Sequence, residues 1–235
     1  MGVSVTSVSS AETVEKLADG VAFVQQDHIC HIYHGSGGQL PAAVPFLKEG
    51  LERHECCVYV ADDLEPSRLI GELEAAGIDV AAEQARGAWV LLEGSGFGMG
   101  DTPIEEWLIS LGDTVTQAKD AGFTGMRIAV DMTWTLTTGT NLSLVQQMES
   151  LANDLFYRDR PVIGMCQYNR ERFSPEVLAG ALASHPMAVV EGRVYRTCIT
   201  GRPRCFSATC RTKRAFSGCS TSSSVTARSR SSMTS

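Results

Sequence analysis

The chain of 235 residues lacks any run of about 18 to 20 consecutive apolar residues, the length that a membrane-spanning helix needs. Its first residues also lack a basic segment followed by an apolar core, which is the pattern of a secretory signal. We therefore expect a cytoplasmic protein whose buried cysteines stay reduced. Apolar residues make up 43% of the chain and charged residues 20%, values typical of a globular protein.

Acidic residues are absent from the last part of the chain. Nine of the 20 Lys and Arg residues follow Gly192, whereas all 27 Asp and Glu residues precede it. The first 191 residues therefore carry 11 basic and 27 acidic residues, a net charge of −16. Because binding to the phosphates of nucleic acid needs a basic surface, we expect no direct contact between this acidic body and nucleic acid.

Three regions differ in composition. Residues 1–26 read as a lead with a short helix that Ser10 caps, and residues 27–196 alternate apolar strands with amphipathic helices. Residues 197–235 are rich in Ser, Thr and Arg and hold four of the eight cysteines, without a C-x2-C pair. This last region is a disordered basic tail, a zinc site or an out-of-frame reading of a GC-rich gene. We favour the third explanation, because a shifted frame restores acidic residues and a strand-and-turn pattern.

The alternation of strands and helices predicts the fold class. We expect strands at residues 29–33, 57–61, 89–92, 126–131, 162–168 and 187–190, and helices at residues 41–53, 66–76, 103–121, 142–156 and 175–183. This order predicts an α/β fold with a doubly wound, mostly parallel sheet. Gly94 to Gly100 holds four glycines in seven residues, so we expect a flexible loop there, a candidate lid that carries Phe97 and Met99.

The glycine-rich turn after the first strand lacks the two side chains that a P-loop uses. A P-loop reads G-x-x-x-x-G-K-[ST], in which the Lys meets the outer phosphates and the Ser or Thr holds Mg²⁺. Here Gly38 stands at the Lys position and Gln39 at the Ser/Thr position. We interpret the turn as a degenerate P-loop that has lost NTP hydrolysis, in which the backbone of Gly35, Gly37 and Gly38 could still cradle a phosphate.

Histidine and cysteine are concentrated just before this turn, at His28, Cys30, His31 and His34, with Tyr33 among them. Strand alternation puts Cys30 and His31 on opposite faces, so one face cannot hold the whole set. These residues bind a ligand or metal, or they fill hydrogen-bonded structural positions, and the sequence leaves both readings open. His28 is the best single candidate, because Asp27 is beside it to orient the ring.

Further polar and aromatic residues follow the later strands. Asp131 closes an apolar strand as a Walker-B acid does, and Trp134 follows it as a candidate pocket wall. Cys166, Gln167 and Tyr168 close another strand. Because ligands bind at the carboxyl edge of open α/β sheets, we expect these residues to line one pocket there, together with His28 and Tyr33.

Glu149 lies on the apolar stripe of a predicted helix. A buried acid needs a partner, and Arg127 and His28 are the candidates. We expect His185, which precedes Pro186, to be a turn residue. The candidate ligand-binding residues are His28, Cys30, Tyr33, Asp131, Trp134, Glu149, Cys166, Gln167 and Tyr168.

Several of these segments, in this order, resemble the MEDS family, the sensory domain shared by methanogen and methylotroph regulators. The matching segments include DHIC with Tyr33, PFLKEGLERHECCVYVADD, GFTGMRIAVDMTW, Glu149, CQYN and His185-Pro186. The resemblance covers roughly residues 27–196, and the family is itself similar to the KaiC/RecA branch of P-loop proteins. It implies a non-catalytic sensory module of signal transduction or transcription regulation, without a cofactor. It also implies a small, hydrocarbon-derived ligand and a kinase, anti-sigma-type or DNA-binding partner protein.

Two other functions stay open at this point. The first is a degenerate RecA-like nucleotide-binding protein or ATPase that uses Asp131 and the turn at Gly35 to Gly38. The second is a metal or redox sensor that works through Cys30, His31 and Cys166.

Overall fold

The structure is a computed structural model that describes residues 23–62, 64–98 and 100–197. The short helix expected near Ser10, the candidate lid residue Met99 and the basic region after residue 197 lie outside the described residues. No helix in the described part of the chain has both the length and the apolar character to cross a bilayer.

The centre of the fold is a sheet in which the strands follow the order β3-β2-β4-β5-β1-β6-β7. Strands β1 to β6 pair in parallel, and β7 pairs with β6 in the antiparallel direction. The strands are β1 His28–Tyr33, β2 Cys56–Ala61, β3 Trp89–Glu93, β4 Met126–Asp131, β5 Val162–Asn169, β6 Met187–Val190 and β7 Arg193–Arg196. The predicted mostly parallel sheet is therefore confirmed.

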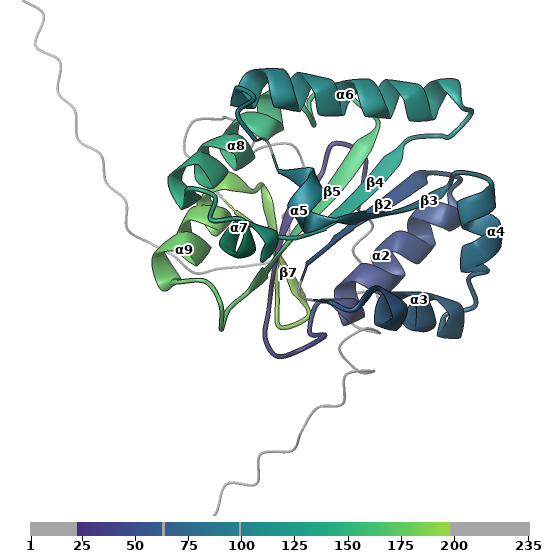
Figure 1. The fold of residues 1–235 in the computed structure, drawn as a ribbon, viewed down its shortest axis with the longest axis horizontal. Coiled ribbons are helices and arrows are strands. Elements are labelled where there is room, and N and C mark those ends of the chain that lie inside the picture. Colours follow the sequence, from purple (N-terminus) through teal and green to yellow (C-terminus); the bar gives the residue numbers. More distant parts are fainter. Residues whose placement is uncertain (1–22, 63, 99, 198–235) are drawn as a thin grey trace, which may run out of the picture. The chain divides into compact units, whose positions relative to one another are not determined.

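Helices cover both faces of this sheet (Figure 1). They are α2 Leu40–Glu52, α3 Pro66–Ala75, α4 Val80–Ala85, α5 Gly94–Phe97, α6 Ile104–Asp120, α7 Trp134–Thr137, α8 Leu142–Leu155 and α9 Pro175–Ser184. The chain runs from β1 toward the β3 edge and then back toward the β7 edge. Because parallel crossovers are right-handed, α2 and α3 lie on one face, whereas α6, α8 and α9 lie on the other, which makes the fold doubly wound.

The glycine-rich segment from residue 94 differs from its prediction. Gly94–Phe97 forms the short helix α5, so the expected flexible loop is wrong for these residues. A Cβ atom at Gly94 would lie 2.5 Å from the Cβ of Trp134, which shows that this glycine serves close packing rather than chain freedom. Phe97 is half-buried and packs edge-on against Trp107 and Trp134, with ring centroids 5.4 and 6.1 Å apart.

The central strands are buried along their whole length in β2, β4 and β5 and nearly so in β1. Side chains therefore leave the sheet alternately toward α2 and toward α8. This alternation decides which of the candidate residues can meet.

Candidate functional site

The sheet divides the predicted site residues between its two faces. Tyr33, Asp131 and Gln167 lie on the α2 face, with His31 and Gln39. On the α8 face lie His28, Glu149, Cys166 and Tyr168, and strand alternation adds Cys30. The structure therefore does not bring all of them into one pocket at the carboxyl edge, because neighbouring residues of a strand point to opposite faces.

Gln167 is the centre of the network on the α2 face. Its Nε2 donates to Nδ1 of His31 and to the carbonyl of Gln39, both at 3.0 Å, and its Oε1 accepts from the Tyr59 hydroxyl at 3.3 Å. Burial lowers the pKa of His31 to about 4, so its ring is neutral at pH 7. The network fixes the ends of β1, β2 and β5 relative to α2.

Asp131 is buried in the same network. It accepts from the backbone N–H and the hydroxyl of Thr133 at 3.2 and 2.8 Å, and from the Tyr33 hydroxyl at 3.4 Å. Its carboxylate therefore holds the turn that follows β4, in the manner of a capping residue.

The glycine-rich turn between β1 and α2 is held by its own backbone. The N–H of Gly38 donates to the carbonyl of Gly35, and the N–H of Leu40 to that of Gly37. A Cβ atom at Gly37 would collide with the guanidinium of Arg68, whose Nη1 lies 3.4 Å from the Ser36 hydroxyl. Phosphate binding by Gly35, Gly37 and Gly38 stays a prediction.

Glu149 of α8 is the centre of a second polar cluster on the opposite face. Its Oε1 accepts from the Tyr168 hydroxyl at 2.8 Å, and its Oε2 lies 3.1 Å from Nε2 of His28 and 3.5 Å from Nε2 of His185. Cys166 Sγ is 3.6 Å from the same oxygen. His28 is thus a partner of Glu149, as one of the two expectations had it. The other candidate, Arg127, pairs with Glu49 and Glu55 on the α2 face.

Burial controls the protonation of this cluster. It lowers the pKa of His185 to about 3 and raises that of the Cys166 thiol, which the Glu149 charge raises further. Burial acts to raise the pKa of Glu149, but the histidines and the Tyr168 hydroxyl outweigh it, and the net shift is downward. A carboxyl group of lowered pKa therefore faces a thiol of raised pKa in the interior.

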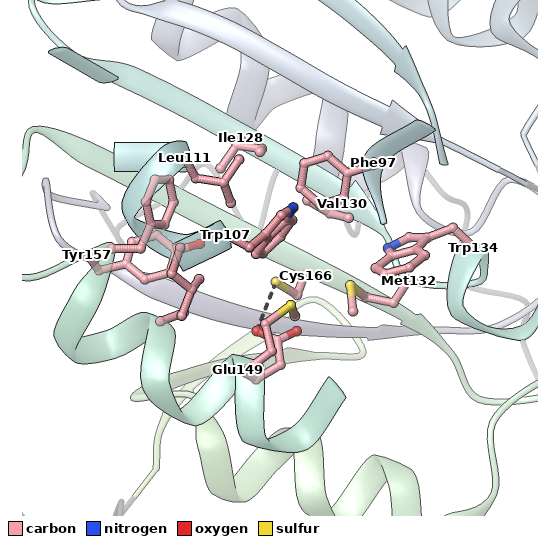
Figure 2. A pocket seen from close by; sticks show the side chains of 14 residues that line it. Phe97, Trp107, Leu111, Ile128, Val130, Met132, Trp134, Glu149, Tyr157 and Cys166 are labelled. Atoms are coloured by element: carbon pink, nitrogen blue, oxygen red, sulfur yellow. Dashed lines mark hydrogen bonds between the residues drawn. The ribbon is translucent and has the colours of Figure 1, made fainter. Parts of the chain in front are cut away.

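A small cavity adjoins this cluster between α6, α8 and the sheet (Figure 2). Its volume is about 40 Å³. Most of its wall is apolar, and Glu149 and Cys166 are on it as polar groups. The residues that line it are Phe97, Trp107, Leu108, Leu111, Ile128, Val130, Met132, Trp134, Met148, Glu149, Ala152, Phe156, Tyr157 and Cys166.

Trp134 adds an unpaired donor to this cavity. The side chain is fully buried, and its Nε1 has no hydrogen-bond partner in the part of the chain that the structure describes. In Figure 2 the indole nitrogen is on the side of the ring that faces the other lining residues. Three of the predicted ligand-binding residues, Trp134, Glu149 and Cys166, therefore line the cavity, as does the predicted lid residue Phe97.

Sequence reasoning missed His185, which is fully buried against Glu149 rather than in an ordinary turn. It also missed Asn153 and Tyr157, which contact the His28 ring. The signal for His185 was its place between the end of an apolar helix and the apolar strand β6, from which Pro186 alone separates it. His28, Glu149, Cys166 and His185 place potential metal-ligand atoms within 4.8 Å of one another.

Comparison with known proteins identifies a family and a relative that this chain resembles. The family described as MEDS: MEthanogen/methylotroph, DcmR Sensory domain matches residues 27–186, the range that holds the cluster and the cavity. The transcriptional repressor DcmR of Methylorubrum extorquens strain DM4 is 28% identical over 166 residues, which is 71% of this chain. The match covers 60% of that repressor, so the chain spans only part of the length of this relative.

Proposed function

Because this chain belongs to the MEDS family of sensory domains, we propose that it binds a small organic molecule and signals its presence to a partner protein. The ligand is bound and released, not transformed. We place the binding site in the cavity beside Glu149 and Cys166.

The size of the cavity carries this proposal. One water needs roughly 10–15 Å³ of such volume, so a cavity of about 40 Å³ holds a molecule of only a few heavy atoms. A nucleotide is far larger than this space. The cavity also lies on the face of the sheet opposite to the side chains of Tyr33 and Asp131. Its dimensions favour a ligand of one or two carbons.

The chemistry of the wall narrows the ligand class. Apolar side chains favour a hydrocarbon part, because burial of apolar surface drives binding. The unpaired Nε1–H of Trp134 favours a halogen or oxygen atom that can accept a hydrogen bond. A short halogenated or oxygenated hydrocarbon satisfies both conditions.

The aromatic side chains at the cavity suggest how binding is transmitted. Phe97 of α5 is in edge-on contact with Trp107 of α6 and with Trp134. An occupant that shifts Phe97 would move α5 and the adjoining end of α6, and so change the surface that a partner contacts. The similarity to a transcriptional repressor supports a partner in gene regulation, such as a kinase, an anti-sigma-type protein or a DNA-binding protein in the cytoplasm.

A thermal-shift experiment tests the proposal on the full chain, with dihalomethanes, short alcohols and short ketones as probes. At 100 times its Kd a ligand adds about 2.7 kcal/mol, which for a domain of this size raises Tm by about 5–11 °C. We expect such a shift for at least one halogenated or oxygenated probe. Trp134→Phe keeps the ring and removes the N–H, so it should reduce the shift for the same probe.

Tyr59→Phe is the matched control. It removes a buried hydrogen bond on the α2 face, to Gln167, and leaves the cavity intact. The shift should persist in this variant. Equal loss in Trp134→Phe and Tyr59→Phe, or a shift only with ATP and Mg²⁺, would place the ligand elsewhere.

A further inference from the structure

The ring nitrogens of the two histidines at Glu149 have fixed proton positions. His185 Nδ1 lies 2.7 Å from the Ala181 carbonyl, which can only accept, so Nδ1 carries a proton. Asn153 Nδ2 donates to the Ser184 carbonyl at 2.7 Å, which leaves Asn153 Oδ1 to accept from His28 Nδ1 at 3.2 Å. In their neutral forms both rings therefore turn the lone pair of Nε2 toward Glu149.

These lone pairs outnumber the protons available to them. His28 Nε2, His185 Nε2 and Glu149 Oε2 are all acceptors, and the Cys166 thiol supplies a single proton among them. A proton shared by His28 and Glu149 would satisfy one pair, but among the described residues His185 Nε2 has no hydrogen-bond partner, and its side chain is fully buried. Unpaired acceptors in the interior are costly, and a bound cation would relieve the cost.

The spacing of the four atoms suits one metal ion. His28 Nε2 lies 3.1 Å from Glu149 Oε2 and 3.4 Å from Cys166 Sγ, and all four ligand-type atoms lie within 4.8 Å of one another. A tetrahedral ion with ligands at about 2.0–2.3 Å has neighbouring ligand atoms about 3.3–3.8 Å apart. Small side-chain movements would close the remaining difference.

The surroundings of the histidines are those of metal ligands. A ligating histidine usually donates its second ring N–H to a carbonyl or carboxylate, which orients the ring. Here the Ala181 carbonyl does this for His185, and the Asn153 amide oxygen for His28. The His28 ring also stacks on Tyr157 at 4.2 Å, so both rings are held before any ion binds.

We propose that His28, Glu149, Cys166 and His185 bind one divalent transition-metal ion, zinc or iron(II) by their donor set. Two imidazoles, a thiolate and a carboxylate suit these borderline metals better than Mg²⁺ or Ca²⁺. Binding releases the Cys166 proton to solvent. Cys30 and His31, the residues first considered for a metal or redox role, are not in this group.

The site shares two residues with the cavity of the proposed sensor, because Glu149 and Cys166 belong to both. A metal ion there would stand at the cavity wall, within reach of a small molecule with a soft or polar atom. The metal proposal does not depend on any organic ligand, and its test uses metal alone.

Cobalt(II) binding tests the site. Thiols are general ligands for soft and borderline metals, so the parent protein is the full chain with Cys198, Cys205, Cys210 and Cys219 changed to serine. After removal of metal with a chelator, we expect one Co²⁺ per chain. It should give the visible bands of a tetrahedral ion and a thiolate-to-cobalt charge-transfer band, and Zn²⁺ should abolish both.

Variants assign the ligands. Cys166→Ser should lose the charge-transfer band, whereas Cys57→Ser should keep it, because Cys57 is buried on the α2 face against Leu47. Asn153→Ala, which removes the partner of His28, should weaken binding about 10- to 100-fold and keep the band. Folding of each variant is checked by circular dichroism. If Cys166→Ser is unfolded, the Co²⁺ stoichiometry of the parent and the weaker Co²⁺ binding of Asn153→Ala test the site instead. A folded parent without stoichiometric Co²⁺, or a thiolate band that survives Cys166→Ser, would overturn the proposal.

Discussion

At the scale of single residues, the neutral ring of His31 decides part of the response to acid. Burial lowers its pKa from 6.5 to about 4, and Gln167 donates to its Nδ1, a bond that requires an unprotonated Nδ1. In the unfolded chain the ring takes up a proton as the pH falls below 6.5, whereas in the folded chain it does not. The contribution of His31 to stability is therefore highest at neutral pH and is lost as the pH falls toward 4.

We predict that His31 makes the free energy of unfolding fall by about 1 kcal/mol per pH unit between about pH 6 and pH 4. His31→Gln keeps an acceptor for Gln167 and does not titrate, so its pH dependence should be shallower by that amount. Urea unfolding of both proteins across this range measures the difference. Identical slopes would show that His31 titrates normally in the folded protein.

Much of the site could not be predicted at this scale. Strand alternation correctly separated Cys30 from His31, and burial of Glu149 correctly demanded a partner such as His28. Alternation does not tell which distant residue packs against a given face of the sheet, so the contact between His185 and Glu149 could not be predicted. The same limit explains why residues from both faces were assigned to one pocket.

At the scale of elements, two helical glycines differ in what surrounds them. A Cβ atom at Gly50 of α2 would lie 2.6 Å from Cys57 Sγ and 2.7 Å from Cδ of Arg127, both buried. A Cβ atom at Gly71 of α3 would meet no atom of the described residues within 4 Å. The first glycine is required by the contact between α2 and the sheet, and the second is not.

We predict that Gly71→Ala stabilises the protein by about 0.5–1 kcal/mol, because alanine has the higher helix propensity. Gly50→Ala gains the same propensity but overpacks the interface. It should therefore be less stable than Gly71→Ala by about 1–3 kcal/mol. The midpoints of urea unfolding give this difference. Equal midpoints would mean that the contact between α2 and the sheet accommodates the added methyl group without loss of stability.

The positions of most elements followed from the sequence. The observed strands β1 to β6 begin and end within one residue of the expected ranges, because buried parallel strands are short apolar runs with clear ends. The short elements α5, α7 and β7 were missed, and α4 was not among the expected helices. In α5 the glycines suggested a loop, and β7 is a short, largely exposed strand with arginine at both ends, without an apolar pattern to reveal it.

At the scale of the whole molecule, the alternation of elements predicted a doubly wound sheet but not the order of its strands. Periodicity identifies a strand without naming its neighbours, and β1 lies between β5 and β6 rather than beside β2. The relation to the KaiC/RecA branch stays a prediction. Sensing by a MEDS domain follows from family membership, whereas the ligand depends on the cavity.

Because β1 lies in the middle of the sheet between β5 and β6, it is synthesised long before the strands that flank it. His31 and Gln167, which meet across the pair of β1 and β5, are 136 residues apart in the chain. At a synthesis rate of about 5–20 residues per second, β1 waits roughly 7–27 seconds on the ribosome before its partner exists. His185 emerges later still, so a metal ion would find its full ligand set only after α9 has also been synthesised. Loading would then report that β1, β5, α8 and the residue after α9 have come together.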